Sequence, residues 1–242
     1  MKKSLFLSVT SFFSACLFLS CASTKISISD YSPVGILGVE GNPTILAVDF
    51  DNQKDEDAGG TLSNAINKLI DGKNPEILTA QDRVDFAEEC LRHALEEIAG
   101  VEVVDKEKIT QSENYKYAKL NILSMTNTNC VAAGYQQDML SLGAKKARVL
   151  MQESGAKGLI SLEFEFDKKL SKKELYAVVK MKVRFIGSNG REILNKEFVE
   201  ESTEKIKVHG LYDSNYDKDT FVTFYPPIIE SIINKFVLEY MN

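Results

Sequence analysis

The alternation of hydrophobic and polar positions along the chain changes its period several times, and each period predicts a different element. Residues 44–50 form a short apolar run, as expected for a strand covered on both faces. Residues 159–166 and 175–185 alternate between apolar and polar side chains, which predicts two strands with one solvated face. A charged loop, 167–173, would join them. The dipeptide Asn189-Gly190 then signals a hairpin that leads into a third, less regular strand up to residue 202.

Apolar residues at helical spacing predict the remaining elements. The clearest helix runs over residues 79–99 and stops at Gly100, and Thr79 with Asp82 resembles a capping box in which Asp replaces Glu. Its apolar stripe consists of Val84, Ala87, Leu91, Ala94, Leu95 and Ile98. Weaker patterns predict a short strand at 101–104, helices at 61–70, 107–123 and 137–153, and a last helix that opens at Pro226-Pro227.

These elements predict an α+β fold, with a mixed sheet of about five strands and helices packed on it. The fold would occupy residues 44–242 as a single domain. If the alternating strands are neighbours, Glu163 and Glu165 lie on the same face as the outward basic residues of 175–185. Such cross-strand pairs explain a solvated face without a binding patch.

The N-terminus has the three parts of a secretory signal peptide: a basic start, an apolar run over residues 5–19, and the small residue Ser20 before Cys21. The run is too short and too rich in serine to be a good membrane-spanning helix. We therefore assign residues 1–20 to a signal peptide.

The sequence Phe18-Leu19-Ser20-Cys21 resembles the lipobox of bacterial lipoproteins. Phe18 replaces the usual aliphatic residue, which is similar to the relaxed boxes of spirochaete lipoproteins. The resemblance implies that Cys21 is lipidated, with enough acyl chains for stable anchoring. Two alternatives stay open: cleavage without lipidation, and acceptance of lipid by Cys16, which would leave a very short apolar run. Residues 21–43, rich in serine, glycine and proline, would then form the lipidated N-terminus and a flexible tether.

Charge limits the classes of partner. The 242 residues carry a net charge of −6, and loss of residues 1–20 removes two lysines, which leaves 27 basic against 35 acidic residues and a charge of −8. Such a balance argues against a nucleic-acid surface, which needs basic patches to neutralise phosphates. It does not favour broad adhesion to anionic lipid either.

Candidate chemistry is sparse. The acidic loop with Asp49, Asp51, Asp55, Glu56 and Asp57 lacks the glycine and glutamate positions of an EF-hand, and Asp213, Asp217 and Asp219 fail the same test. Both groups are interpreted as solvated loops, and no metal ligands are assigned.

The two histidines, His93 and His209, form no zinc-protease motif, and no nucleophile elbow, phosphate loop or dinucleotide fingerprint is present. We assign no catalytic residue and no cofactor. Cys90 and Cys130 remain outside the signal peptide and the anchor. They could pair in an exported protein, or Cys90 could be a buried free thiol on the apolar stripe of its helix.

Two segments carry a family resemblance. One is Ile45-Leu-Ala-Val-Asp-Phe-Asp51 with the polar, glycine-containing loop after it. The other is Met151-Gln-Glu-Ser-Gly-Ala-Lys-Gly-Leu-Ile160, a helix that turns through Gly-Ala into a strand, followed by the hairpin at 187–190. Together they resemble the periplasmic α/β domain of CsgG-type and LpoB-type lipoproteins. The resemblance covers residues 44–240, apart from the polar insert 114–137. It implies a domain type and not secretion, and it assigns no functional residues.

The sequence thus predicts a membrane-anchored envelope lipoprotein whose domain is a non-enzymatic binding, assembly or regulatory module for another envelope component. It would be anchored in the inner or outer membrane and face the periplasm or the cell surface. The alternative is a secreted lipoprotein that uses the acidic loop region to bind a ligand or metal or, less favoured, to catalyse a reaction. The expected partners are the membrane, through the lipid, and an envelope protein, with no nucleic acid. The oligomeric state stays open.

Overall fold

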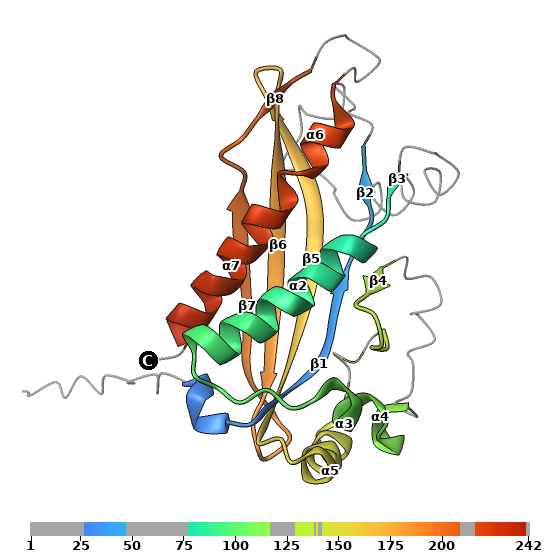
Figure 1. Cartoon of the computed structure of the whole chain (residues 1–242), viewed down its shortest axis with the longest axis vertical. Helices are drawn as coiled ribbons and strands as arrows, with labels where there is room; N and C mark the ends of the chain where they lie inside the picture. Colours follow the sequence, from blue (N-terminus) through green and yellow to red (C-terminus); the bar gives the residue numbers. More distant parts are fainter. Residues whose placement is uncertain are drawn as a thin grey trace, which may run out of the picture.

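The fold is built on one mixed sheet, whose strands lie side by side behind α2 and α7 in Figure 1. The computed structural model describes residues 27–46, 77–116, 129–137, 139, 142–208 and 216–240. The strand order is β4-β1-β5-β6-β7, and the short β8 pairs with the start of β6. β1 and β5 are parallel, and the other neighbours are antiparallel. The strands are β1 (Val34–Gly41), β4 (Cys130–Val131), β5 (Gly158–Ser171), β6 (Glu174–Ile186), β7 (Glu192–Glu201) and β8 (Ile206–Lys207).

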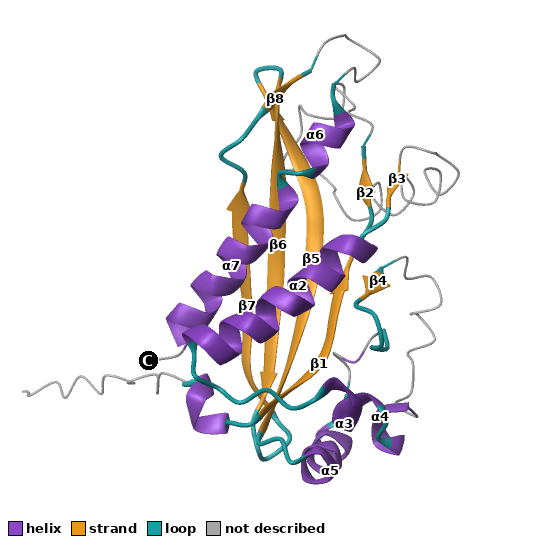
Figure 2. Cartoon of the chain, viewed as in Figure 1, coloured by secondary structure: helices purple, strands orange, loops and turns teal. Residues whose placement is uncertain are grey.

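Two helices cover one face of this sheet (Figure 2). They are α2 (Gln81–His93), which continues into the π-helical turn η3 (Ala94–Ile98), and α7 (Tyr225–Tyr240). The core lies between these helices and the sheet, where aromatic side chains such as Phe164, Phe166 and Tyr225 are fully buried. The predicted α+β class, a mixed sheet with helices packed on it, is confirmed.

Smaller elements complete the structure at its edges. They are η1 (Ile28–Tyr31), α3 (Lys106–Thr110), α4 (Glu113–Lys116), α5 (Ala144–Ser154), α6 (Lys218–Val222), and the two-stranded sheet of β2 (Thr44–Ile45) and β3 (Ile77–Leu78). The strand predicted at 44–50 is present at its first two residues, but it belongs to this small sheet. Residues 47–50 and the helix predicted at 61–70 lie outside the described residues.

The most important correction concerns β1, because we predicted a flexible tether there. Every residue of Val34–Gly41 is buried, and the strand lies between β4 and β5 inside the sheet. Its glycines allow close packing: a Cβ at Gly35 would lie 2.7 Å from Ile109 Cδ1, and one at Gly41 would lie 2.5 Å from the Phe166 ring. The folded domain therefore includes Ile28 and Val34–Gly41, well before residue 44.

The β5–β6 hairpin confirms the predicted alternation and lengthens both strands. Glu163 pairs with Lys182 and Glu165 with Lys180 in the register, and the latter two form an ion pair of 3.3 Å. The predicted charged loop 167–173 is wrong, because β5 continues to Ser171 and only two residues make the turn. Side chains alternate between the two faces of a strand, so the hairpin continues through the charged residues while Leu170 and Leu175 pack against the core.

Two helix boundaries and one strand also differ from the sequence prediction. Ala80, and not Thr79, is the N-cap residue of α2, and no side chain caps it. α5 begins after Gly143, since glycine inside a helix costs about 1 kcal/mol relative to alanine. The strand predicted at 101–104 is reduced to a single parallel bridge, Val34 with Val103.

The C-terminal segment Lys218–Tyr240 is long and apolar enough to cross a membrane by length and composition alone. Its apolar stripe instead packs on the sheet, through the buried residues Ile228, Ile229, Ile232, Ile233, Phe236 and Val237. Half of the apolar window is buried within the fold. We therefore interpret α7 as a core helix, as predicted from its one-sided stripe.

Candidate functional site

Several residues singled out from the sequence lie outside the described part of the chain. They are Cys21, the whole acidic loop from Asp49 to Asp57, His209 and Asp213. His93 is exposed at the end of α2. No group of three or more potential metal ligands occurs among the residues that the structure describes.

Asp217 has a structural role as the N-cap of α6. One carboxylate oxygen accepts a hydrogen bond from the Thr220 amide at 3.1 Å, and the other accepts one from the Thr220 hydroxyl at 2.6 Å. These bonds lower the pKa of Asp217. The carboxylate is thus used to satisfy the free N–H groups of a helix start, which is a common role of aspartate.

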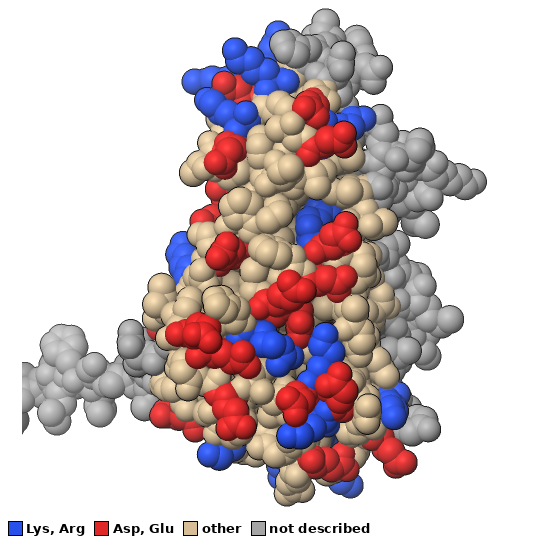
Figure 3. Space-filling view, viewed as in Figure 1, with Lys and Arg blue, Asp and Glu red and all other residues tan. Residues whose placement is uncertain are grey.

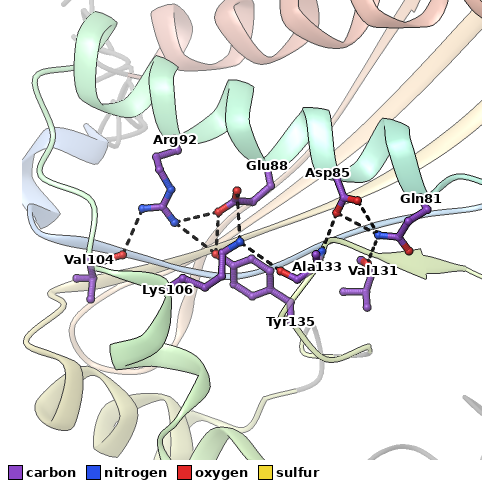
Figure 4. Close-up of polar contacts among 9 residues, drawn as sticks. All are labelled: Gln81, Asp85, Glu88, Arg92, Val104, Lys106, Val131, Ala133 and Tyr135. Carbon is purple, nitrogen blue, oxygen red and sulfur yellow. Dashed lines mark hydrogen bonds and ion pairs between the residues drawn. The ribbon is translucent and has the colours of Figure 1, made fainter.

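The richest polar arrangement lies along α2, in a stripe formed by Gln81, Asp85, Glu88 and Arg92 (Figure 4). At its first half, Gln81 donates to both oxygens of Asp85 and to the carbonyl of Val131, each at 3.0 Å. Asp85 accepts a further bond of 2.7 Å from the Ala133 amide. This half therefore joins α2 to the segment around β4.

Glu88 is the centre of the second half, with a side chain that is 7% exposed. Its Oε1 accepts from Arg92 Nη2 and from the Tyr135 hydroxyl, both at 2.9 Å, and Lys106 Nζ lies 3.7 Å from Oε2. Lys106 also lies over the Tyr135 ring, 4.9 Å from its centroid. Arg92 reaches the Val104 carbonyl at 3.4 Å. One buried carboxylate thus joins three separate segments.

The groups around Glu88 shift one another's pKa values. Burial alone would lower the pKa of Arg92, but the Glu88 hydrogen bond and charge raise it. Burial and the Glu88 charge raise the pKa of Tyr135, so its hydroxyl stays protonated and donates. The Glu88 carboxylate accepts hydrogen bonds from Arg92 and Tyr135 and lies near Lys106. We therefore interpret it as a structural group and not as a catalytic base. We interpret the α2 polar stripe as a clamp.

A buried cation, Arg83, lies on the sheet side of α2 and is 5% exposed. Its guanidinium carbon lies 4.5 Å from the centre of the Phe166 ring and 4.8 Å from that of Tyr225. Nη1 donates to Thr44 Oγ1 at 2.6 Å, and Nη2 donates to the carbonyl of Thr79 at 3.1 Å. Burial lowers its pKa, and Nε has no hydrogen-bond partner among the described residues. Arg83 fastens the β2–β3 sheet to the main core.

Sequence reasoning missed both arrangements, although each left a signal. Gln81, Asp85, Glu88 and Arg92 follow one another at spacings of four, three and four, which places them on one helix face. Arg83 stands next to Val84 within the apolar side of the same helix. A cation at such a position suggests an aromatic or polar partner in the core, because arginine is rarely buried without one.

The two cysteines left open by the sequence, Cys90 and Cys130, are both free thiols and half-buried. Burial, with the nearby charges of Glu230 and Glu89, raises the pKa of Cys90 to about 11. Its thiol is therefore a weak nucleophile at neutral pH.

This pKa predicts slow alkylation of Cys90. At pH 8 only about one thiol in a thousand would be ionised, so reaction with iodoacetamide should be on the order of a hundredfold slower than for a free cysteine. The rate should rise about tenfold per pH unit up to pH 10, as followed by peptide mass spectrometry of the native chain. Rapid alkylation at pH 8, or recovery of a peptide disulfide between Cys90 and Cys130, would contradict this environment.

No protein-family model and no curated protein matches the chain in sequence. Among solved structures, the LpoB C-terminal domain of Salmonella enterica aligns with 73% of this chain and 86% of its own, at 10% identity and a TM-score of 0.33. Lipoprotein GNA1162 of Neisseria meningitidis aligns with 83% of this chain and 97% of its own, at 12% identity and a TM-score of 0.34. Both TM-scores are below 0.5, so we draw no functional conclusion from either match.

Proposed function

We propose that the protein is a lipid-anchored module of a bacterial cell envelope, whose domain binds another envelope component and catalyses no reaction. The single observation that carries this proposal is how soon the domain begins after Cys21. Ile28 is already fully buried in the core, seven residues after the proposed anchor. The signal-like N-terminus and the ordered domain are therefore almost contiguous.

The short spacing determines where such a protein can act. Seven residues span at most about 25 Å when fully extended. A lipidated Cys21 would therefore keep the domain at the membrane surface, and any partner must come within that short reach. This replaces the long tether expected from the sequence, because residues 34–41 belong to the sheet.

The contacts of the buried polar groups support a function that is not enzymatic. The described buried cation and carboxylate on α2, Arg83 and Glu88, are engaged in contacts that join segments of the fold. A binding role needs only a surface that is held near its partner, and the lipid anchor would hold this domain at the membrane. The partner is expected to be a protein of the same envelope.

The test is replacement of the proposed acceptor, Cys21→Ala, in the full chain expressed in a bacterial host. Labelling with an alkyne fatty acid should mark the wild type and the matched variant Cys16→Ala, but not Cys21→Ala. The latter should also leave the membrane fraction after a high-salt wash, which screens charge contacts, if the signal peptide is still cleaved. Label retained by Cys21→Ala would refute the anchor.

Crosslinking in intact cells tests the binding half of the proposal with the same variants. A specific envelope protein should be recovered with the wild type and with Cys16→Ala, and much less with Cys21→Ala. Recovery of only abundant neighbours from all three chains would refute a dedicated partner, while leaving lipidation at Cys21 intact.

A further inference from the structure

The end of the β5–β6 hairpin carries a cluster of lysines, although the net charge of the chain is negative. The turn consists of Lys172 and Lys173, and β8, which pairs beside it, brings Lys205 and Lys207 to the same end. Residues 172–174 and 205–207 together hold four lysines and one acidic residue, Glu174. Figure 3 shows basic side chains gathered at this end of the molecule, while acidic ones are spread over the α2 and α7 face.

The turn residues adopt a backbone conformation that lysine rarely takes. Ser171 pairs with Glu174, so the hairpin has a two-residue turn, and φ is +52° at Lys172 and +67° at Lys173. Two-residue hairpin turns with positive φ at both positions favour Asn-Gly. A side chain other than glycine or asparagine costs free energy there, and such strain often marks residues kept for function.

These amino groups are also available for binding. Lys172, Lys173 and Lys207 are exposed and form no ion pair within the described ranges, whereas Lys205 is paired with Glu174. The turn itself is held in place, because the Val208 amide donates to the Lys173 carbonyl at 2.9 Å. The hairpin end thus presents, on a fixed backbone, three lysines without an ion pair among the described residues.

The kind of cation indicates the kind of partner. All four are lysines, which are depleted from protein–protein interfaces, where arginine and aromatic residues provide most of the binding energy. Lysine clusters are instead typical of contacts with anionic lipid headgroups, at about 1 kcal/mol for each lysine near the surface. Physiological salt screens charges beyond about 8 Å, so the acidic remainder of the chain does not cancel this local field.

We propose that the lysine-bearing end of the β5–β6 hairpin, with β8, docks onto an anionic membrane surface. The contact does not depend on lipid at Cys21, so it stands or falls separately from the anchor. It reverses, for this one end of the molecule, the expectation from net charge that the protein would not adhere to anionic lipid.

The first test reads the contact at the lysines themselves. The full chain is acetylated with an amine reagent in the presence of phosphatidylcholine vesicles, or of vesicles with equal phosphatidylcholine and phosphatidylglycerol. Lys172 and Lys173 should be protected only by the mixed vesicles, and high salt should remove the protection. The exposed lysines Lys157 and Lys196 serve as internal controls and should react equally in both.

The second test uses variants that separate binding from folding. K172N/K173G places the preferred residues in the turn, so it should melt at or above the wild-type temperature. The ratio of its affinity for mixed vesicles to that for phosphatidylcholine vesicles should nevertheless fall about thirtyfold, as two lysines are lost. The matched variant K157N/K196N removes the same charge elsewhere and should keep the ratio.

Three results would overturn the proposal. They are equal protection by both kinds of vesicle, an unchanged ratio for K172N/K173G, and an equal loss for both double variants. Protection of Lys172 and Lys173 by poly-L-glutamate, without protection by mixed vesicles, would assign the hairpin end to an acidic protein surface instead.

Discussion

Arg83→Ala is expected to lower the free energy of unfolding by about 3–5 kcal/mol, because it empties a buried position and breaks several contacts at once. The guanidinium contacts the rings of both Phe166 and Tyr225, which pack edge to face, and it binds Thr44 and the Thr79 carbonyl. Truncation leaves a cavity beside these two rings and leaves the buried Thr44 hydroxyl without its donor. Urea unfolding, followed by circular dichroism, measures the loss.

Two further variants separate charge from packing at this position. Arg83→Met keeps an unbranched stem against the rings and removes the cost of a buried charge, so it should lose much less stability than Arg83→Ala. Arg83→Lys keeps the charge but not the planar stacking group, and it should lie between them. Arg191→Ala, at an exposed arginine, should change the free energy of unfolding by less than about 0.5 kcal/mol.

The segment that loses stability in Arg83→Ala is as informative as the size of the loss. If Arg83 fastens the β2–β3 sheet, Arg83→Ala should speed hydrogen exchange at Thr44 and Leu78 more than in the β5–β6 hairpin. Equal stabilities of Arg83→Ala and wild type would mean that the cation gives no net stabilisation. Uniformly faster exchange would mean that it supports the whole core and not the small sheet.

The regular parts of the fold could be predicted because their signals are local. Alternation in 159–166 and 175–185, the Asn189-Gly190 turn and the apolar stripe of α7 each depend on neighbouring residues, and each is present. The hairpin turn is closed by a bond of 2.8 Å from the Gly190 amide to the Gly187 carbonyl. In these segments propensity, pattern and tertiary packing agree.

β1 could not be predicted, because its sequence gives local signals that oppose its tertiary role. Val-Gly-Ile-Leu-Gly-Val-Glu-Gly contains three glycines, which lower strand propensity and suggest a linker. The glycines are needed because Ile109 and Phe166 pack directly against this backbone. Those contacts come from distant parts of the chain, so only the folded structure reveals why glycine suits the position.

The candidate site could likewise be predicted only in part from local signals. The spacing of Gln81, Asp85, Glu88 and Arg92 predicts a polar helix face, but it does not say what that face binds. Val131, Ala133 and Tyr135 are partners more than forty residues away in sequence. Val104 and Lys106 are partners from another segment. The sequence predicts a charged loop at the hairpin lysines and does not predict the two-residue turn. The positive φ of both turn residues is a property of the folded backbone alone.

Glu88→Ala is expected to lower the free energy of unfolding by about 2–3 kcal/mol. Removing one partner of a buried ion pair typically costs 3–5 kcal/mol, roughly, because the remaining charges lose their compensation. Here the effect is smaller, since the side chains of Arg92 and Lys106 are 26% and 31% exposed and can regain water. Thermal and urea unfolding of the variant, compared with the wild type, provide the measurement.

The neighbouring Glu89 supplies a matched control, because it is exposed on the same helix and Glu89→Ala should stay within about 0.5 kcal/mol of wild type. Glu88→Gln keeps the length and the acceptor, so it should lose less than Glu88→Ala. If the α2 polar stripe acts as one unit, Glu88→Ala should cost less in an Arg92→Ala background, since its main partner is already absent. Additive losses in the double variant would show that the two residues stabilise the fold independently, and the clamp interpretation would then fail.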